Sequence, residues 1–178
     1  DYFRANKISY KPVPIESNEE ARKNYIADRC DTYTTDRSGL AATRATFTKP
    51  DDHVILPEII SKEPLGPVVR HGDDQWADII RWTIFALIAA EEHGVTAANA
   101  DAMAAKKTPA TARLLGSEGT LGEMLGLDKD WAKRAIKAQG NYAEIFERNV
   151  GTKTNIGLAR GLNAHYTNGG LQYSPPFR

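Results

Sequence analysis

Asp36 is the acidic residue whose position in the sequence best suits the binding of a ligand. It ends the segment 31–36, DTYTTD, whose Thr and Tyr residues favour a strand, and a segment with helical character follows it. In open parallel sheets, ligands bind outside the carboxyl ends of the strands. A carboxylate at such an end can pair with the ammonium group of a ligand. The alternative is that Asp36 only caps the helix that begins near Ser38, and the pattern favours neither reading over the other.

The histidines and the cysteine form no recognisable catalytic or metal-binding motif. His53, His71, His93 and His165 lie far apart in the sequence, and none belongs to a compact ligand pattern such as HExxH. There is no GxSxG motif either, although a catalytic triad can also assemble from distant residues. We therefore expect neither a metal nor an organic cofactor. Cys30 has no second thiol in the chain, so we expect it to be a half-buried small apolar residue or to pair with a cysteine of a longer parent chain.

Most of the other charged and aromatic residues have a structural explanation. Arg37 and Arg44 could bind a carboxylate, but exposed arginines are more common. The acidic pairs 51–52 and 73–74 lie in turn-like stretches and suit turn or capping positions. Large apolar side chains at helical spacing predict a buried helix face; they are Trp76, Ile79, Trp82 and Phe85.

The first 70 residues alternate between strand and helix patterns. Ser17 followed by Glu20 is a capping box that begins a helix. The expected strands are 9–15, 31–36, 53–60 and 65–70, and the expected helices are 17–28 and 38–47. This order favours the α/β class, in which a parallel sheet carries helices on its faces.

From residue 74 onward helical periodicity dominates, and glycines separate the helices. The expected helices are 76–92, 97–105, 130–139, 142–149 and 156–166, and an extended tail follows at 174–178. The apolar stretch 76–90 contains Asp78 and Arg81. It is shorter than the roughly 20 apolar residues that a membrane span needs, so it predicts a buried amphipathic helix.

The charge balance argues against some classes of partner. The chain has 178 residues, of which 41% are hydrophobic, as in an ordinary globular protein. It carries 23 Lys and Arg residues and 23 Asp and Glu residues, so its formal net charge is zero. Proteins that bind nucleic acid are usually distinctly basic, so we expect no nucleic acid among the partners.

Long strings of this sequence resemble the general L-amino-acid-binding proteins of Gram-negative ABC transporters. The resemblance covers essentially the whole chain, and it is specific because long strings match in order. The strings are DYFRANKISYKPV, ARKNYIADRCDTYTTDRSGLAA, DDHVILPEIISKEPLGPVVRHGDDQWADIIRWTIFALI, NYAEIFERNVG and GLARGLNAHYTNGGLQYSPPFR.

The resemblance implies a partial type II periplasmic-binding fold, whose two α/β lobes are joined by crossing strands and trap the ligand between them. Residues 1–63 then belong to the second lobe, and 64–73 form the strand that returns to the first lobe. Residues 74–178 are helices that pack on the first lobe, together with the family's C-terminal extension. The first lobe is absent from the chain, with its carboxylate-binding arginine and its aromatic wall. The Gly-Thr-rich turn that opens the second lobe is absent as well, so the chain corresponds to the C-terminal half of the family.

The same resemblance implies transport and not catalysis. The family captures L-amino acids in the periplasm by hinge closure and delivers them to a membrane permease. Asp36 matches the aspartate that receives the α-amino group of the ligand, and Thr34 and Thr35 beside it are weaker candidates for ligand contacts. The preferred amino acid is not implied, because side-chain contacts from the first lobe largely set it.

Two other functions use the same fold and stay open. Some dehydratases resemble solute receptors, although Asp36 is the one residue here that offers acid–base chemistry. Sensory ligand-binding modules usually adjoin a membrane span. The opening residues, DYFRAN, are similar to the end of a helix, so we expect a fragment. Such a fragment would associate with a second copy or with a separate N-terminal fragment.

Overall fold

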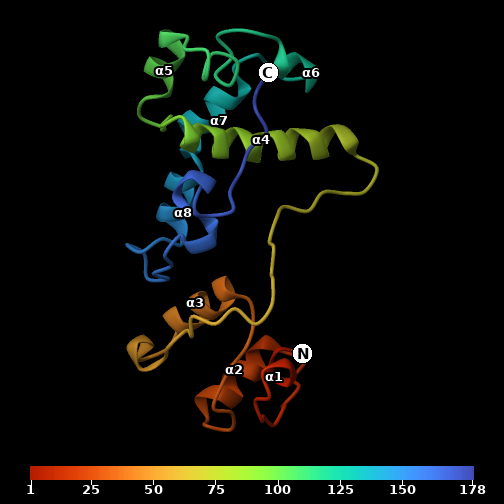
Figure 1. Ribbon diagram of the computed structural model, residues 1–178, viewed down its shortest axis with the longest axis vertical. Coiled ribbons are helices and arrows are strands. Elements are labelled where there is room, and N and C mark those ends of the chain that lie inside the picture. Colours follow the sequence, from red (N-terminus) through yellow and green to blue (C-terminus); the bar gives the residue numbers. More distant parts are fainter. The chain divides into compact units, whose positions relative to one another are not determined.

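The chain divides into two compact units, and both are helical. The computed structural model describes residues 1–178 (Figure 1). Backbone contacts divide them into unit 1, Asp1–Leu65, and unit 2, Gly66–Arg178. No β-strand is formed, and a single isolated bridge joins His165 to Gln172. No helix combines the length and the apolar character that crossing a bilayer requires.

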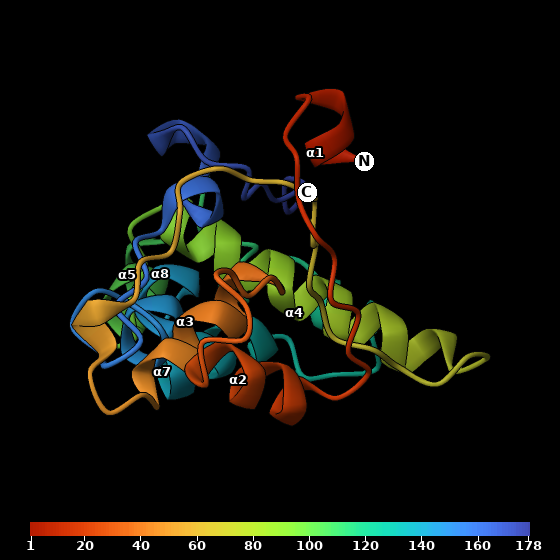
Figure 2. The same cartoon turned by 90° about the horizontal axis from the view of Figure 1, so that it is seen from below.

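Unit 1 consists of short helices joined by irregular segments. Its elements are α1 (Tyr2–Ala5), α2 (Asn18–Ile26), α3 (Arg37–Ala45) and the 3₁₀ helix η1 (Pro50–Asp52). Figures 1 and 2 show α2 and α3 as the two main helices of this unit. Ser17 begins α2 as predicted, because its hydroxyl accepts a hydrogen bond from the Glu20 backbone N–H at 3.4 Å. Both helices predicted for this part of the chain are confirmed, with small shifts at their ends.

A small aromatic cluster holds unit 1 together. The Tyr25 hydroxyl lies 2.9 Å from Nδ1 of His53. The centroid of the Phe47 ring lies 6.0 Å from that of Tyr25 and 4.5 Å from that of His53. These contacts join the end of α2 to the chain that follows α3. Ala41 is the only fully buried hydrophobic residue of the unit, so this cluster takes the place of a large core.

The predicted strands, and with them the predicted parallel sheet, are not formed. The irregular, unpaired segments are 9–15, 31–36, 53–60 and 65–70. A strand exists only when its backbone N–H and C=O groups bond to a neighbouring strand, and no such neighbour lies within the chain. Apolar side chains consequently stay exposed: Val54 is 77% exposed and Val68 95%. The prediction of a sheet is therefore wrong for this chain by itself.

Unit 2 is a group of helices around the longest one, α4 (Asp74–Glu92). The others are α5 (Ala100–Lys106), α6 (Leu121–Met124), α7 (Trp131–Gln139) and α8 (Tyr142–Asn149), followed by the 3₁₀ helices η2 (Gly161–Asn163) and η3 (Tyr166–Asn168). Helix α4 packs on α7 and α8, and α5 packs on α7. The predicted helices that correspond to α4, α5, α7 and α8 are confirmed.

The last predicted helix, 156–166, is wrong. Gly157 and Gly161 have φ angles of 69° and 48°, in the left-handed region that a right-handed helix does not use. Only the short turn η2 forms there. The chain then folds back on itself, so that the Gln172 backbone N–H donates to the Ala164 carbonyl at 3.1 Å.

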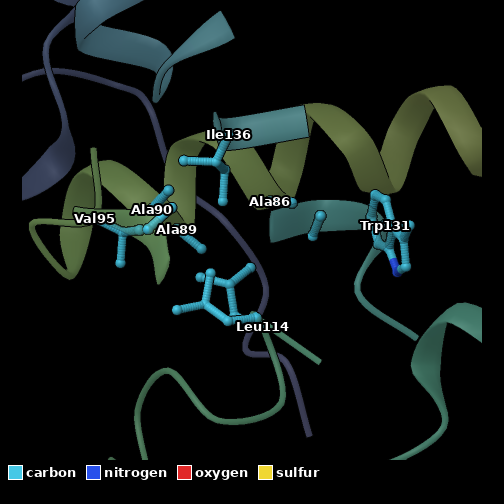
Figure 3. Close-up of a cluster of buried hydrophobic side chains, with 10 residues drawn as sticks. Ala86, Ala89, Ala90, Val95, Leu114, Trp131 and Ile136 are labelled. Carbon is cyan, nitrogen blue, oxygen red and sulfur yellow. The ribbon is translucent and has the colours of Figure 1, made fainter. Parts of the chain in front are cut away.

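The core of unit 2 lies along an alanine-rich face of α4. Ala86, Ala89 and Ala90 are buried at helical spacing, and their small side chains let α7 approach closely. From α7, Trp131 and Ile136 lie against this face (Figure 3). The packing role predicted for Trp131 is thus confirmed. The other buried members of this core are Val95, Ala100, Leu114, Leu115 and Ala132.

The C-terminal tail also packs on α4. The ring of Phe177 meets the ring of Trp82 edge to face, with 5.5 Å between centroids. The tail 174–178 has no regular structure, as predicted. Trp76 is 49% exposed and the other members of the predicted apolar stripe are half-buried, so the fully buried face of α4 is formed by other residues.

Arg160, which lies after α8, forms a largely buried ion pair with Glu91 of α4. Arg160 donates to both carboxylate oxygens of Glu91, at 3.0 and 2.9 Å. Its guanidinium carbon lies 5.3 Å from the ring centroids of Tyr142 and Phe146, both on α8. The side chains of Arg160 and Glu91 are only 16% and 13% exposed. Each charge is therefore largely desolvated and depends on the other.

We expect Arg160→Met to destabilise the chain by about 3 kcal/mol, because it leaves the Glu91 carboxylate unpaired in a largely buried position. Thermal unfolding followed by circular dichroism measures the change. Arg81→Met is the matched control, since the pair of Arg81 with Asp78 is exposed and is expected to contribute less than about 1 kcal/mol. Equal effects of the two substitutions would contradict the role assigned to Arg160.

Candidate functional site

Asp36 lies at the N-terminus of α3 and caps that helix. Its backbone is extended, with φ −60° and ψ 150°. Its Oδ2 atom accepts hydrogen bonds from the Gly39 backbone N–H at 2.8 Å and from the Ser38 hydroxyl at 2.5 Å. The capping alternative drawn from the sequence is therefore confirmed. The binding of a ligand by Asp36 stays a prediction.

The second carboxylate oxygen of Asp36 is much less engaged. Oδ1 has one long contact, with the Thr35 hydroxyl at 3.4 Å. An ionised carboxylate offers about four lone-pair sites over its two oxygens. The protein thus occupies Oδ2 with two donors and leaves Oδ1 able to accept from a further donor.

The surroundings of Asp36 favour its charged form. The hydrogen bond from the Ser38 hydroxyl is the largest influence that lowers the pKa of the Asp36 carboxyl from the ordinary value of 3.8. The Gly39 backbone N–H lowers this pKa further, and partial burial opposes the change without reversing it. Asp36 is therefore an anion at neutral pH, the state that suits a cationic group of a ligand.

Gly39 leaves room for the Asp36 carboxylate. A β-carbon at position 39 would lie 2.8 Å from Oδ1 of Asp36 and 3.4 Å from Cγ2 of Thr35. The first distance is well inside van der Waals contact, so one of the two groups would have to move. The carboxylate is the end of a short side chain and would move first.

Of the two threonines predicted beside Asp36, the structure brings only one to the carboxylate. Thr34 and Thr35 are both exposed, and only the hydroxyl of Thr35 contacts Asp36. The sequence patterns do not identify Ser38 and Gly39, which both donate to Asp36. A capping aspartate accepts from a backbone N–H two or three residues into the helix, so Gly39 could have been found in this way. No spacing rule points to the Ser38 hydroxyl.

A separate open hollow of about 560 Å³ lies in unit 1. The aromatic cluster lines it with Tyr25, Phe47 and His53, and the half-buried free Cys30 also contributes, which agrees with the burial predicted for this residue. Asp36 does not line the hollow, so the hollow is distinct from the predicted ligand site. No group of three or more His, Cys, Asp or Glu side chains is arranged to hold a metal ion.

The chain is homologous along its whole length to amino-acid-binding proteins of ABC transporters. No family model matches it. Curated relatives match 100% of the chain at 50% to 59% identity, which confirms the resemblance drawn from the sequence. The chain spans about half the length of these relatives, and it corresponds to their C-terminal half.

Two curated relatives and one solved structure illustrate this similarity. The chain is 59% identical to the glutamate/glutamine/aspartate/asparagine-binding protein BztA of Rhodobacter capsulatus, over 100% of the chain and 53% of that protein. It is 56% identical to the general L-amino acid-binding periplasmic protein AapJ of Rhizobium johnstonii, with the same two coverages. A periplasmic binding protein of an ABC transporter from Brucella ovis, solved with glutathione bound, is 55% identical and matches with a TM-score of 0.91. That match covers 99% of this chain and 56% of the other.

Ser38→Ala is expected to raise the titration midpoint of the Asp36 carboxyl, because it removes the largest influence that lowers this pKa. Because the pKa of Asp36 is lowered in the folded state, its ionised carboxylate stabilises the fold at pH values above the ordinary pKa of 3.8. This stabilisation is lost as the pH falls through the lower pKa of the folded state. The side-chain carboxyl chemical shift of Asp36, followed by carbon-13 NMR on acidification, measures the midpoint. Ser38→Thr keeps the hydroxyl and serves as the control. An unmoved midpoint in Ser38→Ala would rule out this hydrogen bond in solution.

Proposed function

We propose that the chain acts as the C-terminal half of a periplasmic receptor that delivers amino acids to an ABC importer. Homology over the whole chain and the TM-score of 0.91 to a periplasmic binding protein support this proposal. In the receptor, residues 1–63 belong to the second α/β lobe and 64–73 return to the first lobe. Residues 74–178 then pack on the first lobe. The relatives are named as binding proteins, which supports capture of the ligand without chemical change.

The unpaired segments of the chain support a larger α/β fold. Apolar side chains at Val54, Leu56, Ile59 and Leu65 are between 57% and 77% exposed. In the complete receptor, other parts of the polypeptide pair with these segments, turn them into strands and cover their apolar side chains. This restores the sheets of a type II periplasmic-binding fold around the helices described above.

The ligands named for the relatives have one chemical group in common. Glutamate, glutamine, aspartate, asparagine and other L-amino acids carry a free α-ammonium group, and so does the γ-glutamyl end of glutathione. A receptor that accepts such a range gains most from contacts to the shared group. The Asp36 carboxylate suits it, because it is an anion whose Oδ1 has only one long contact to the protein.

The neighbouring threonines supply polar contacts around this anchor. The Thr35 hydroxyl reaches Asp36 Oδ1, and Thr34 precedes it on an exposed stretch. Closure of the two lobes on the ligand removes water from the carboxylate–ammonium pair and strengthens it. The closed form then docks on the membrane permease, which is the second partner that this function requires. Neither a cofactor nor nucleic acid takes part.

Asp36→Asn in the complete receptor is expected to weaken binding by about 30-fold or more for every amino acid that binds, because a desolvated charge pair loses one partner. Asparagine also caps helices well, so the melting temperature should change little. Calorimetric titration with each of the twenty standard L-amino acids measures the affinities.

Asp51→Asn is the control for the loss of one negative charge. Asp51 is exposed in η1, within the same unit as Asp36. Equal affinities of Asp36→Asn and Asp51→Asn would remove Asp36 from the site. Conversion of a bound amino acid by the wild-type receptor would replace the transport function with that of a receptor-like dehydratase.

A further inference from the structure

We propose that Ser38 and Gly39 are positioning residues for ligand binding. They hold Asp36 so that its Oδ2 accepts hydrogen bonds from the start of α3 and its Oδ1 is left to accept from the ammonium group of the ligand. The inference rests on the proposed function, since it concerns the same carboxylate. It assigns a separate task to each oxygen atom of Asp36 and names the residues that enforce the division.

The two protein donors both reach the same oxygen. The Ser38 hydroxyl and the Gly39 backbone N–H lie 2.5 and 2.8 Å from Oδ2, whereas the only protein donor to Oδ1 is the Thr35 hydroxyl at 3.4 Å. Two donors on one oxygen fix the rotation of the carboxylate about its Cβ–Cγ bond. This rotation would otherwise be broad, because such terminal torsions have shallow wells. The ligand therefore meets an oriented acceptor and does not bear the entropy of ordering it.

Gly39 leaves space beside the other oxygen, Oδ1. A β-carbon there would lie 2.8 Å from Oδ1, the oxygen assigned to the ligand, and 3.4 Å from Cγ, the carboxylate carbon of Asp36. No positive φ requires a glycine at this position, since Gly39 is not among the residues with that backbone conformation. Space beside the carboxylate, and not backbone strain, is what the missing side chain provides. A methyl group at this position should thus displace the carboxylate and disturb binding, while alanine itself favours the helix over glycine.

The experiment compares single variants of the complete receptor by calorimetric titration with the twenty standard L-amino acids. Ser38→Ala is expected to lower the affinity about 10-fold, by a similar factor for each amino acid that binds. It should also move the acid limb of the affinity–pH profile to higher pH, because the loss of the hydroxyl raises the pKa of Asp36. Ser38→Thr should restore most of the affinity and the wild-type acid limb.

Gly39→Ala separates positioning from stability. It is expected to lower the affinity about 10-fold, while the melting temperature changes little, since the preference of alanine for a helix offsets the strain on the cap. Ser17→Ala is the control for the loss of a serine at a helix N-terminus: Ser17 caps α2, and its removal should lower the melting temperature slightly with unchanged affinity.

The outcomes distinguish this inference from the proposed function. If Asp36→Asn weakens binding but Ser38→Ala and Gly39→Ala bind like wild type, the positioning role is wrong and the anchor stands. If Asp36→Asn has no effect, or if no amino acid binds the wild-type receptor, the anchor is wrong and the positioning role is wrong with it. A loss of affinity in Gly39→Ala that is matched by an equal loss in Ser17→Ala would also overturn the inference, because it would report general destabilisation.

Discussion

A segment with strand composition becomes a strand only when a second segment pairs with it, and unit 1 depends on this constraint throughout. Apolar residues recur along its irregular segments, yet Ala41 is the only fully buried hydrophobic residue there. The contact between Tyr25, Phe47 and His53 keeps the helices together but covers little apolar surface. Each exposed apolar side chain that a partner segment covers would contribute roughly 25 cal/mol per Å². The proposed receptor supplies such segments. Formation of the sheet would then also support α3, whose N-terminus is capped by Asp36.

Unit 2 consists of helices, so it needs no second segment to complete its backbone hydrogen bonds. Helix α4 buries its alanine face against Trp131 and Ile136, and its other contacts come from residues far along the chain. Arg160 reaches back to Glu91, and Phe177 reaches back to Trp82. These helices form inside the chain because a helix satisfies its own backbone hydrogen bonds. A helix therefore needs only side-chain packing from its neighbours, whereas a strand needs their backbone too.

This difference explains which elements the sequence predicts. Local signals suffice for helices: the cap at Ser17 and the periodicity of α4 and α7 predict elements that the structure contains. The strand patterns are equally regular, but their outcome depends on partners that no local pattern reports. The predicted helix at 156–166 fails for a different reason: Gly157 and Gly161 have positive φ angles, and Arg160 between them reaches back to Glu91 on α4. The same limit applies at Asp36, where the residue type indicates the capping role but the spacing does not predict the Ser38 hydroxyl.

The two interpretations of Asp36 that the sequence leaves open, a helix cap and a ligand anchor, are compatible because a carboxylate has two oxygens. A cap needs one acceptor, and Oδ2 satisfies it through Gly39. The cap also places the negative charge at the positive end of the α3 dipole, which favours the ionised state. An isolated carboxylate buried by lobe closure would tend to take up a proton instead. The hydrogen bonds to Oδ2 offset that tendency. In the proposed receptor, the helix cap would therefore keep Asp36 an anion when lobe closure excludes water from its other oxygen.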